Sequence, residues 1–314
     1  MANHAKCCVA VDDVLVEGGR TGVLLIHRLG GSPADMAFIT EGLAQDGYTV
    51  ACPVLFGHCG SRDLLGATTW GHWYKSVQDA HDELKTRCDT VIVAGLGVGA
   101  LLALHLACER PTEVHAVVLL SPTFWPNGWA MPWHSTLFRL IDHKGLANLL
   151  RFDDRPPYGI KDEVLRRAML DGLDVDGRSR ADSMGRCGGV LLELKWLAKT
   201  VLPELPRVSQ PCLIFHSRHD DRSSLSASQL LQRRLCGIVD LVVLEDSYHL
   251  VTLDRQRPFV LDRILEFAAA LPRLLQKRPM AKVSSTVMPG KPSAEPVDAS
   301  TNSPGSVTGT APAE

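Results

Sequence analysis

Acidic and histidine residues follow two late apolar runs of this 314-residue chain. The stretch "HSRHDDRSS" (216–224) contains Asp220 and Asp221, and "DSYHLVTLD" (246–254) contains His249. A carboxylate that bonds one ring nitrogen of a histidine makes the other nitrogen a general base, which can activate a nucleophile. An acid after one late strand and a histidine after the next follow the order nucleophile, acid, base. The order places the nucleophile earlier in the chain.

A glycine occupies the point where that nucleophile is expected. The segment "VIVAGLGVGALLALHLA" (91–107) predicts a strand, a sharp turn and a helix, which is the arrangement of the G-x-S-x-G nucleophile elbow. The pentapeptide here is Gly95-Leu96-Gly97-Val98-Gly99, so Gly97 stands at the tip and has no atom that can attack a carbonyl. The tip residue of an elbow has a positive φ, which costs a non-glycine residue on the order of 1–3 kcal/mol. Gly97 therefore stabilises the turn and removes the nucleophile.

Alternating strands and helices position these motifs. We predict strands at 23–27, 49–53, 90–95, 116–121, 212–217 and 240–245, and helices within 33–47, 70–87, 99–110 and 226–236. Nearly continuous apolar strands separated by helices indicate a doubly wound α/β domain with a mostly parallel sheet.

One long connection and the end of the chain break this alternation. About 90 residues separate the strands at 116–121 and 212–217, several times a normal connection. We therefore assign 1–121 and 206–277 to the core and 122–205 to a helical cap over the carboxyl edge of the sheet, where open α/β sheets bind ligands. Residues 278–314 are rich in Pro, Ser, Thr and Gly, and we expect this tail to be disordered.

Composition excludes several classes of partner. The net charge is −2 and no run of basic residues predicts binding to nucleic acid or to an anionic membrane. The nine cysteines have no C-x-x-C or zinc spacing, which indicates reduced thiols in a cytoplasmic protein. The N-terminus lacks the basic stretch followed by an apolar stretch that is typical of a signal peptide. No apolar run reaches the roughly 18 residues of a membrane-spanning helix. We expect neither a metal nor a cofactor, and the sequence leaves the oligomeric state open.

Taken together, four motifs resemble those of the α/β-hydrolase superfamily. The chain is most similar to capped bacterial carboxylesterases, monoacylglycerol lipases and serine-aminopeptidase-like hydrolases, which carry H-G-x-G-G, G-H-G-x-S, G-L-S-M-G and S-x-H-x-x-T-x-D in this order. The corresponding stretches here are "HRLGGSPAD" (27–35), "LFGHCGS" (55–61), "GLGVG" (95–99) and "DSYHLVTLD" (246–254). The resemblance spans roughly residues 10–272 and implies an eight-stranded type of α/β-hydrolase sheet with an inserted helical cap.

The resemblance also implies roles for individual residues. His249 would be the general base, oriented by Asp220 or alternatively by Asp221, and Gly97 would hold the nucleophile position without a nucleophile. The backbone amides of Leu29 and Val98 match the oxyanion-hole positions of the family.

A second departure from the family pattern lies in the oxyanion loop. Arg28 stands where the family has glycine, which brings a bulky cation to the loop or forces the loop to move.

These features support three interpretations of the function. The first is a catalytically impaired esterase homologue that binds an ester-, acyl- or lactone-like small molecule. The second is an active ester hydrolase that uses a water activated by His249, or a displaced nucleophile such as Ser121, Cys52 or Ser32. The third is a non-enzymatic interaction protein on the same scaffold. The N-myc downstream-regulated family is similar in lacking the serine, although that resemblance covers the elbow only.

Overall fold

The computed structural model of the protein describes residues 12–59, 62–131, 138, 140–152, 155–171 and 186–276. These residues form a seven-stranded main sheet in the order β1-β3-β2-β4-β5-β8-β9. Its strands are β1 (Val14–Val16), β2 (Thr21–Ile26), β3 (Thr49–Cys52), β4 (Thr90–Leu96), β5 (Ala116–Leu120), β8 (Cys212–Ser217) and β9 (Val239–Leu244). Only β1 runs antiparallel to its neighbour, which confirms the predicted mostly parallel sheet.

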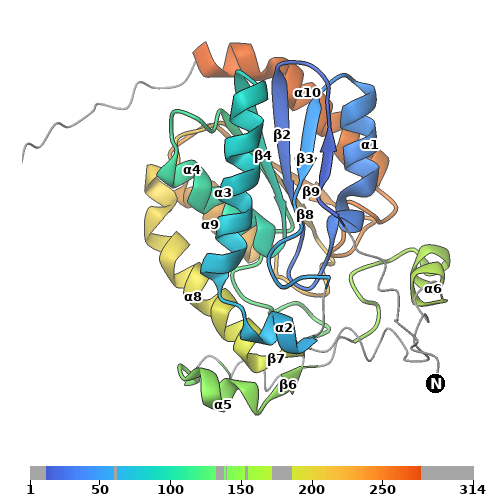
Figure 1. Cartoon of the computed structure of the whole chain (residues 1–314). Helices are drawn as coiled ribbons and strands as arrows, with labels where there is room; N and C mark the ends of the chain where they lie inside the picture. Colours follow the sequence, from blue (N-terminus) through green and yellow to red (C-terminus); the bar gives the residue numbers. More distant parts are fainter. Residues whose placement is uncertain are drawn as a thin grey trace, which may run out of the picture. The chain divides into compact units, whose positions relative to one another are not determined.

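Helices cover both faces of this sheet (Figure 1). On one face lie α3 (Trp70–Arg87), α4 (Val98–Glu109), α8 (Gly188–Glu204) and α9 (Ser226–Arg234). On the other lie α1 (Ala37–Gln45), which follows the 3-10 turn η1 (Pro33–Met36), and α10 (Arg257–Gln276). A second 3-10 turn, η3 (Leu205–Arg207), follows α8. The doubly wound arrangement predicted from the alternation of strands and helices is therefore confirmed.

Strand β2 shows how the sequence builds the two layers. Successive side chains of a strand point to opposite faces of its sheet. Leu24 and Ile26 pack into the core cluster with α3 and α4, whereas Val23 and Leu25 pack into the cluster with α1 and α10. Because both faces are buried, the strand reads as a continuous apolar run in the sequence.

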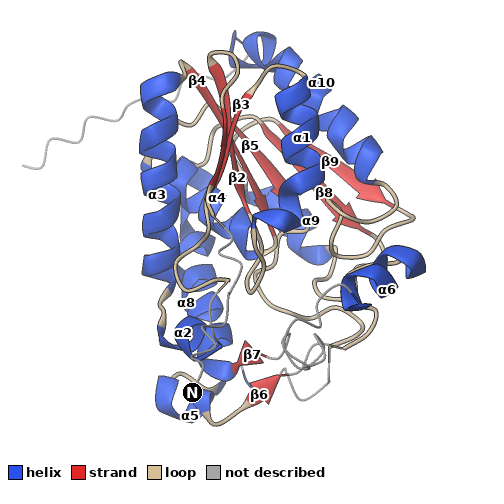
Figure 2. Ribbon diagram, turned by 45° about the vertical axis from the view of Figure 1, so that its right-hand side comes forward, coloured by secondary structure: helices blue, strands red, loops and turns tan. Residues whose placement is uncertain are grey.

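The segment between β5 and β8 carries further elements at one end of the sheet. These are α5 (Lys144–Asn148), α6 (Glu163–Asp171) and the two-stranded antiparallel sheet of β6 (Arg151–Phe152) and β7 (Arg186–Cys187). Figure 2 shows α5, β6 and β7 beyond the ends of the central strands, together with α2 (Arg62–Ala67). The proposed cap at 122–205 includes all of α8, although Val201 near the end of α8 packs into the main core.

The structure differs from the sequence predictions at several points. The short antiparallel strand β1 and the helix α2 were not predicted, and the predicted helix at 33–47 is divided into η1 and α1. The described residues hold seven strands of the main sheet rather than eight, and residues 1–11 lie outside the described part. The predicted disordered tail at 278–314 also lies outside it. No described helix combines the length and the apolar character needed to cross a membrane.

Candidate active site

The strand–turn–helix at Gly97 has the geometry of an elbow. Strand β4 ends at Leu96, helix α4 begins at Val98, and Gly97 joins them with φ 60° and ψ −111°. The flanking glycines allow the strand and the helix to approach each other. A Cβ on Gly95 would lie 2.1 Å from the carbonyl oxygen of Gly99, and one on Gly99 would lie 2.3 Å from that of Ile26. The tight turn therefore needs glycine at both positions.

Gly97 itself has room for a side chain. A Cβ placed there would lie 3.4 Å from Nε2 of His249, 3.5 Å from Cβ of Arg28 and 3.9 Å from Oγ1 of Thr123, all of which are ordinary contacts. A hydroxyl carried on that Cβ would therefore come within reach of His249. The limit at this position is conformational rather than steric, because a positive φ disfavours every residue except glycine.

Asp220 and His249 are brought together from the loops after β8 and β9. Nδ1 of His249 lies 2.8 Å from Oδ2 of Asp220, and both side chains are buried. The other carboxylate oxygen, Oδ1, accepts hydrogen bonds from the backbone amides of Arg222 at 2.7 Å and Ser223 at 2.8 Å. Burial by itself would raise the pKa of Asp220, but the charge of His249 and the hydrogen bonds from His249 and from the Ser223 amide hold the pKa below its usual range. A carboxylate held in this way can orient the imidazole.

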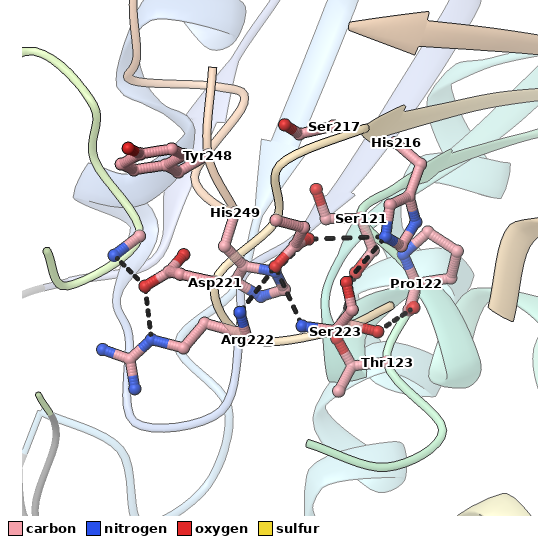
Figure 3. A network of polar contacts seen from close by, with 12 residues as sticks. Ser121, Pro122, Thr123, His216, Ser217, Asp221, Arg222, Ser223, Tyr248 and His249 are labelled. Carbon is pink, nitrogen blue, oxygen red and sulfur yellow. Dashed lines mark hydrogen bonds and ion pairs between the residues drawn. The ribbon is translucent and has the colours of Figure 1, made fainter. Parts of the chain in front are cut away.

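The neighbouring Asp221 points to a different set of partners. Its Oδ2 accepts hydrogen bonds from the backbone amide of Gly159 at 2.9 Å and from Nε of Arg222 at 3.2 Å (Figure 3). Burial raises the pKa of Asp221 above its ordinary value. Gly159 in turn accepts a hydrogen bond at 2.8 Å from the amide of Leu250, the residue after His249. Asp220 is therefore the carboxylate that bonds the His249 ring, and Asp221 joins the segment before α6 to the loops after β8 and β9.

His216, near the end of β8, approaches the same carboxylate oxygen of Asp220 as His249 does. Its Nε2 lies 2.9 Å from the carbonyl oxygen of Ser223 and 3.5 Å from Oδ2 of Asp220, and its Nδ1 lies 2.8 Å from Oγ of Ser228. Burial lowers the pKa of His216, so its ring stays neutral at neutral pH. Figure 3 shows His216, Ser223, Arg222 and His249 in one network. The sequence analysis did not predict this packing of His216 against Asp220.

Hydrogen bonds fix the backbone of the loop after β2, which contains Arg28. The ring of His27 is buried, which lowers its pKa to about 4, so the ring is neutral at neutral pH. Its Nε2 accepts a hydrogen bond from the amide of Leu55 at 3.1 Å, and its Nδ1 donates to the carbonyl of Arg28 at 2.9 Å. The amide of Gly31 donates to the same carbonyl at 3.0 Å. Because a trans peptide is planar, fixing this carbonyl also fixes the direction of the Leu29 N–H in the same peptide unit.

The side chain of Arg28 is folded against the loop. Its Nε lies 3.2 Å from Oδ2 of Asp35, and the two side chains are only 10% and 6% exposed. The loop therefore accommodates the cation within a buried ion pair.

A cavity opens between the elbow and the segment after β5. It is lined by Gly97, His249, Arg28 and Thr123, by the predicted oxyanion positions Leu29 and Val98, and by Arg222. Apolar side chains from the proposed cap complete the walls, including Met131, Phe152, Leu191 and Leu194. The arrangement places His249, Leu29 and Val98 at one apolar chamber, around an elbow that carries no nucleophile.

The remaining candidate nucleophiles occupy other surroundings. Ser32 accepts a hydrogen bond from the amide of Ala34 and caps η1, and Cys52 is buried in the core, which raises its pKa. Ser121 follows β5 with φ 45°, and its buried Oγ has no hydrogen-bond partner among the described residues. The ring of His58 packs edge-on against His27, with 5.1 Å between ring centroids, and against Trp73.

Comparison with known proteins places this geometry in context. The model of a family described as the alpha/beta hydrolase family matches residues 23–263. A thermostable monoacylglycerol lipase of Bacillus sp. (strain H-257) is 29% identical over 255 residues, covering 81% of this chain and 92% of the lipase. A carboxylesterase of Bacillus subtilis (strain 168) is 22% identical over 259 residues, covering 81% and 95%.

Solved structures show the same arrangement of strands and helices. A structure from a study of two metagenome-derived lipolytic enzymes, LipS and LipT, superimposes with a TM-score of 0.68 at 25% identity, covering 82% of this chain and 97% of that one. A monoacylglycerol lipase of Paleococcus ferrophilus also gives a TM-score of 0.68, at 16% identity, covering 84% and 100%.

Proposed function

Because the chain belongs to the α/β-hydrolase family, we propose that it is a relative of carboxylesterases and lipases that lacks the nucleophile and binds an ester- or acyl-like small molecule. One observation carries the proposal. The position that faces Nε2 of His249 is Gly97, where a Cβ would lie 3.4 Å from that nitrogen. The base and its carboxylate are in bonding geometry, but nothing on the elbow can attack a carbonyl.

The cavity supports the binding part of the proposal. Its walls are mainly apolar, and His249, Arg28 and Thr123 lie beside Gly97. Pockets for small molecules usually combine apolar walls with a few placed polar groups. An acyl chain would lie along Leu191 and Leu194, and its carbonyl end would approach Leu29 and Val98.

Hydrolysis of 4-nitrophenyl butyrate and octanoate by the parent chain and by Gly97→Ser tests the catalytic part. We expect little or no turnover by the parent, because loss of the nucleophile in a serine protease cost on the order of 10⁶-fold. Gly97→Ser should restore part of the activity, and a fluorophosphonate probe should label this variant but not the parent. Labelling of the parent would reveal a nucleophile elsewhere in the chain and would contradict the proposal.

A water-dependent esterase is the second candidate, because His249 keeps its bond to Asp220 and faces open space at Gly97. It predicts slow hydrolysis by the parent that His249→Ala abolishes. The exposed His219, next to Asp220 in the loop after β8, supplies a matched control, since His219→Ala should leave that hydrolysis unchanged. The same assay therefore separates the two candidates.

A further inference from the structure

Arg28 is a nearly buried cation whose hydrogen-bonding capacity is mostly unused. The residue is 8% exposed and lines the cavity beside Gly97. Its Nε is buried and lies 3.2 Å from Oδ2 of Asp35, but without the alignment of a hydrogen bond. Its two terminal amino groups make no hydrogen bond or ion pair with a described residue. A guanidinium carries five N–H donors, and here the buried Nε is left without a hydrogen bond, which is costly. Such a group is suited to a ligand that accepts hydrogen bonds.

The start of helix α4 provides an independent attraction for negative charge at the same end of the cavity. This twelve-residue helix begins at Val98, which lines the cavity. Its N-cap is Gly97, and no side chain caps its first amides. The N-terminus of a helix carries a partial positive charge and open N–H groups, which together favour an anion.

The remaining lining residues do not neutralise this end of the cavity. No aspartate or glutamate is among the described residues that line it. Arg222 also lines the cavity, but its Nε bonds Asp221, which compensates its charge. The polar end is therefore formed by Arg28, the start of α4 and His249, while the walls are apolar.

We propose that the cavity binds a monocarboxylate with an apolar tail, and that Arg28 binds the carboxylate. The proposal rests on the proposed function, because it specifies the ligand of the same cavity. A carboxylate presents two oxygens to the planar guanidinium, whereas a neutral ester or amide presents one carbonyl oxygen and no charge. Asp35 already compensates part of the Arg28 charge, so a monoanion matches the site better than a dianion such as phosphate.

Isothermal titration calorimetry of the full chain with octanoate and with octanamide tests the proposed carboxylate site. The two ligands have nearly the same size, and only octanoate is charged at pH 7.5. We expect octanoate to bind about 10- to 100-fold more tightly, the range for hydrogen bonds that involve charged groups. Arg28→Gln should abolish this preference. Arg20→Gln is the matched control, because Arg20 is exposed and pairs with Asp89 away from the cavity, and it should preserve the preference.

Removing the charge of Arg28 leaves Asp35 buried without its cation, so Arg28→Gln alone can unfold the chain. The double variant Arg28→Gln/Asp35→Asn removes both charges and keeps the test valid. Equal affinity for octanoate and octanamide, binding of neither, or a preference that survives in the double variant would each overturn the proposal. Inorganic phosphate binding as tightly as octanoate would also overturn it, by showing an anion site that does not use the apolar walls.

The same experiment keeps the two proposals apart. Ester turnover by the parent together with tight binding of octanoate would refute the loss of catalysis and leave the carboxylate site in place, as a site for the product. Absence of turnover together with equal binding of acid and amide would refute the carboxylate site alone.

Discussion

Placing alanine or serine at position 97 separates backbone strain from packing at the elbow. Gly97 has φ 60° and ψ −111°, and a Cβ there would have no contact closer than 3.4 Å. The cost of Gly97→Ala is therefore strain alone, about 1–3 kcal/mol of the free energy of unfolding. For a domain of this size that corresponds to a fall in Tm of roughly 2–12 °C.

Serine at the same position carries the same strain and adds one interaction. A hydroxyl on that Cβ can reach Nε2 of His249, and a typical hydrogen bond contributes about 0.5–1.5 kcal/mol. Gly97→Ser should therefore be more stable than Gly97→Ala by about that amount. In the background of His249→Ala, where the partner is absent, the difference should disappear.

Urea unfolding followed by tryptophan fluorescence measures these differences. Gly99→Ala provides the contrast, because its Cβ would lie 2.3 Å from the carbonyl oxygen of Ile26 and the backbone would have to move. We expect it to be at least as destabilised as Gly97→Ala. A Gly97→Ala variant as stable as the parent would refute the strain argument, and a serine advantage that persists without His249 would refute the proposed contact.

Three further predictions follow from the buried charges. The folded-state pKa of Asp220 is lowered and that of Asp221 is raised. Urea unfolding of the parent, Asp220→Asn and Asp221→Asn at a series of pH values tests both directions. As the pH rises through the unfolded pKa of about 3.9, the stability of the parent relative to Asp220→Asn should increase. Over the same rise in pH, the stability of the parent relative to Asp221→Asn should decrease. Arg28→Gly should lower the unfolding free energy by about 3–5 kcal/mol, since it leaves the buried Asp35 without its cation, and Asp35→Asn should recover part of this loss in thermal unfolding. The ring of His27 should titrate in NMR spectra at about 4, and a midpoint near 6.5 would contradict its burial as a neutral donor.

The sequence predicts the framework well because its strands are buried on both faces. The range 212–217 coincides with β8, since "CLIFHS" is a continuous apolar run that ends at polar residues, and 70–87 coincides with α3. Strand β1 was missed because its three residues follow two aspartates and precede "EGG", which makes the run too short to stand out. Local pattern is informative only where an element is long enough to show its period.

The candidate site was predictable in part, for a similar reason. The order of the motifs places Gly97, Asp220 and His249 at the carboxyl ends of β4, β8 and β9, and the structure brings all three together. The contacts of Asp221 with Gly159 and of His216 with Asp220 were missed. The first joins residues 62 positions apart through a backbone amide, which leaves no trace in residue type. The second depends on side-chain packing within a loop, which no periodicity reports.

The two backbone amides that bond Oδ1 of Asp220 have a consequence for how such chains evolve. The carboxylate closes the turn at Arg222 and Ser223 whether or not the protein performs any chemistry. Selection for a stable fold would thus retain this aspartate, and through it the ordered histidine, long after a nucleophile had been replaced. A surviving acid–histidine pair is accordingly poor evidence of turnover among distant homologues, and the identity of the elbow residue is the better character by which to sort them.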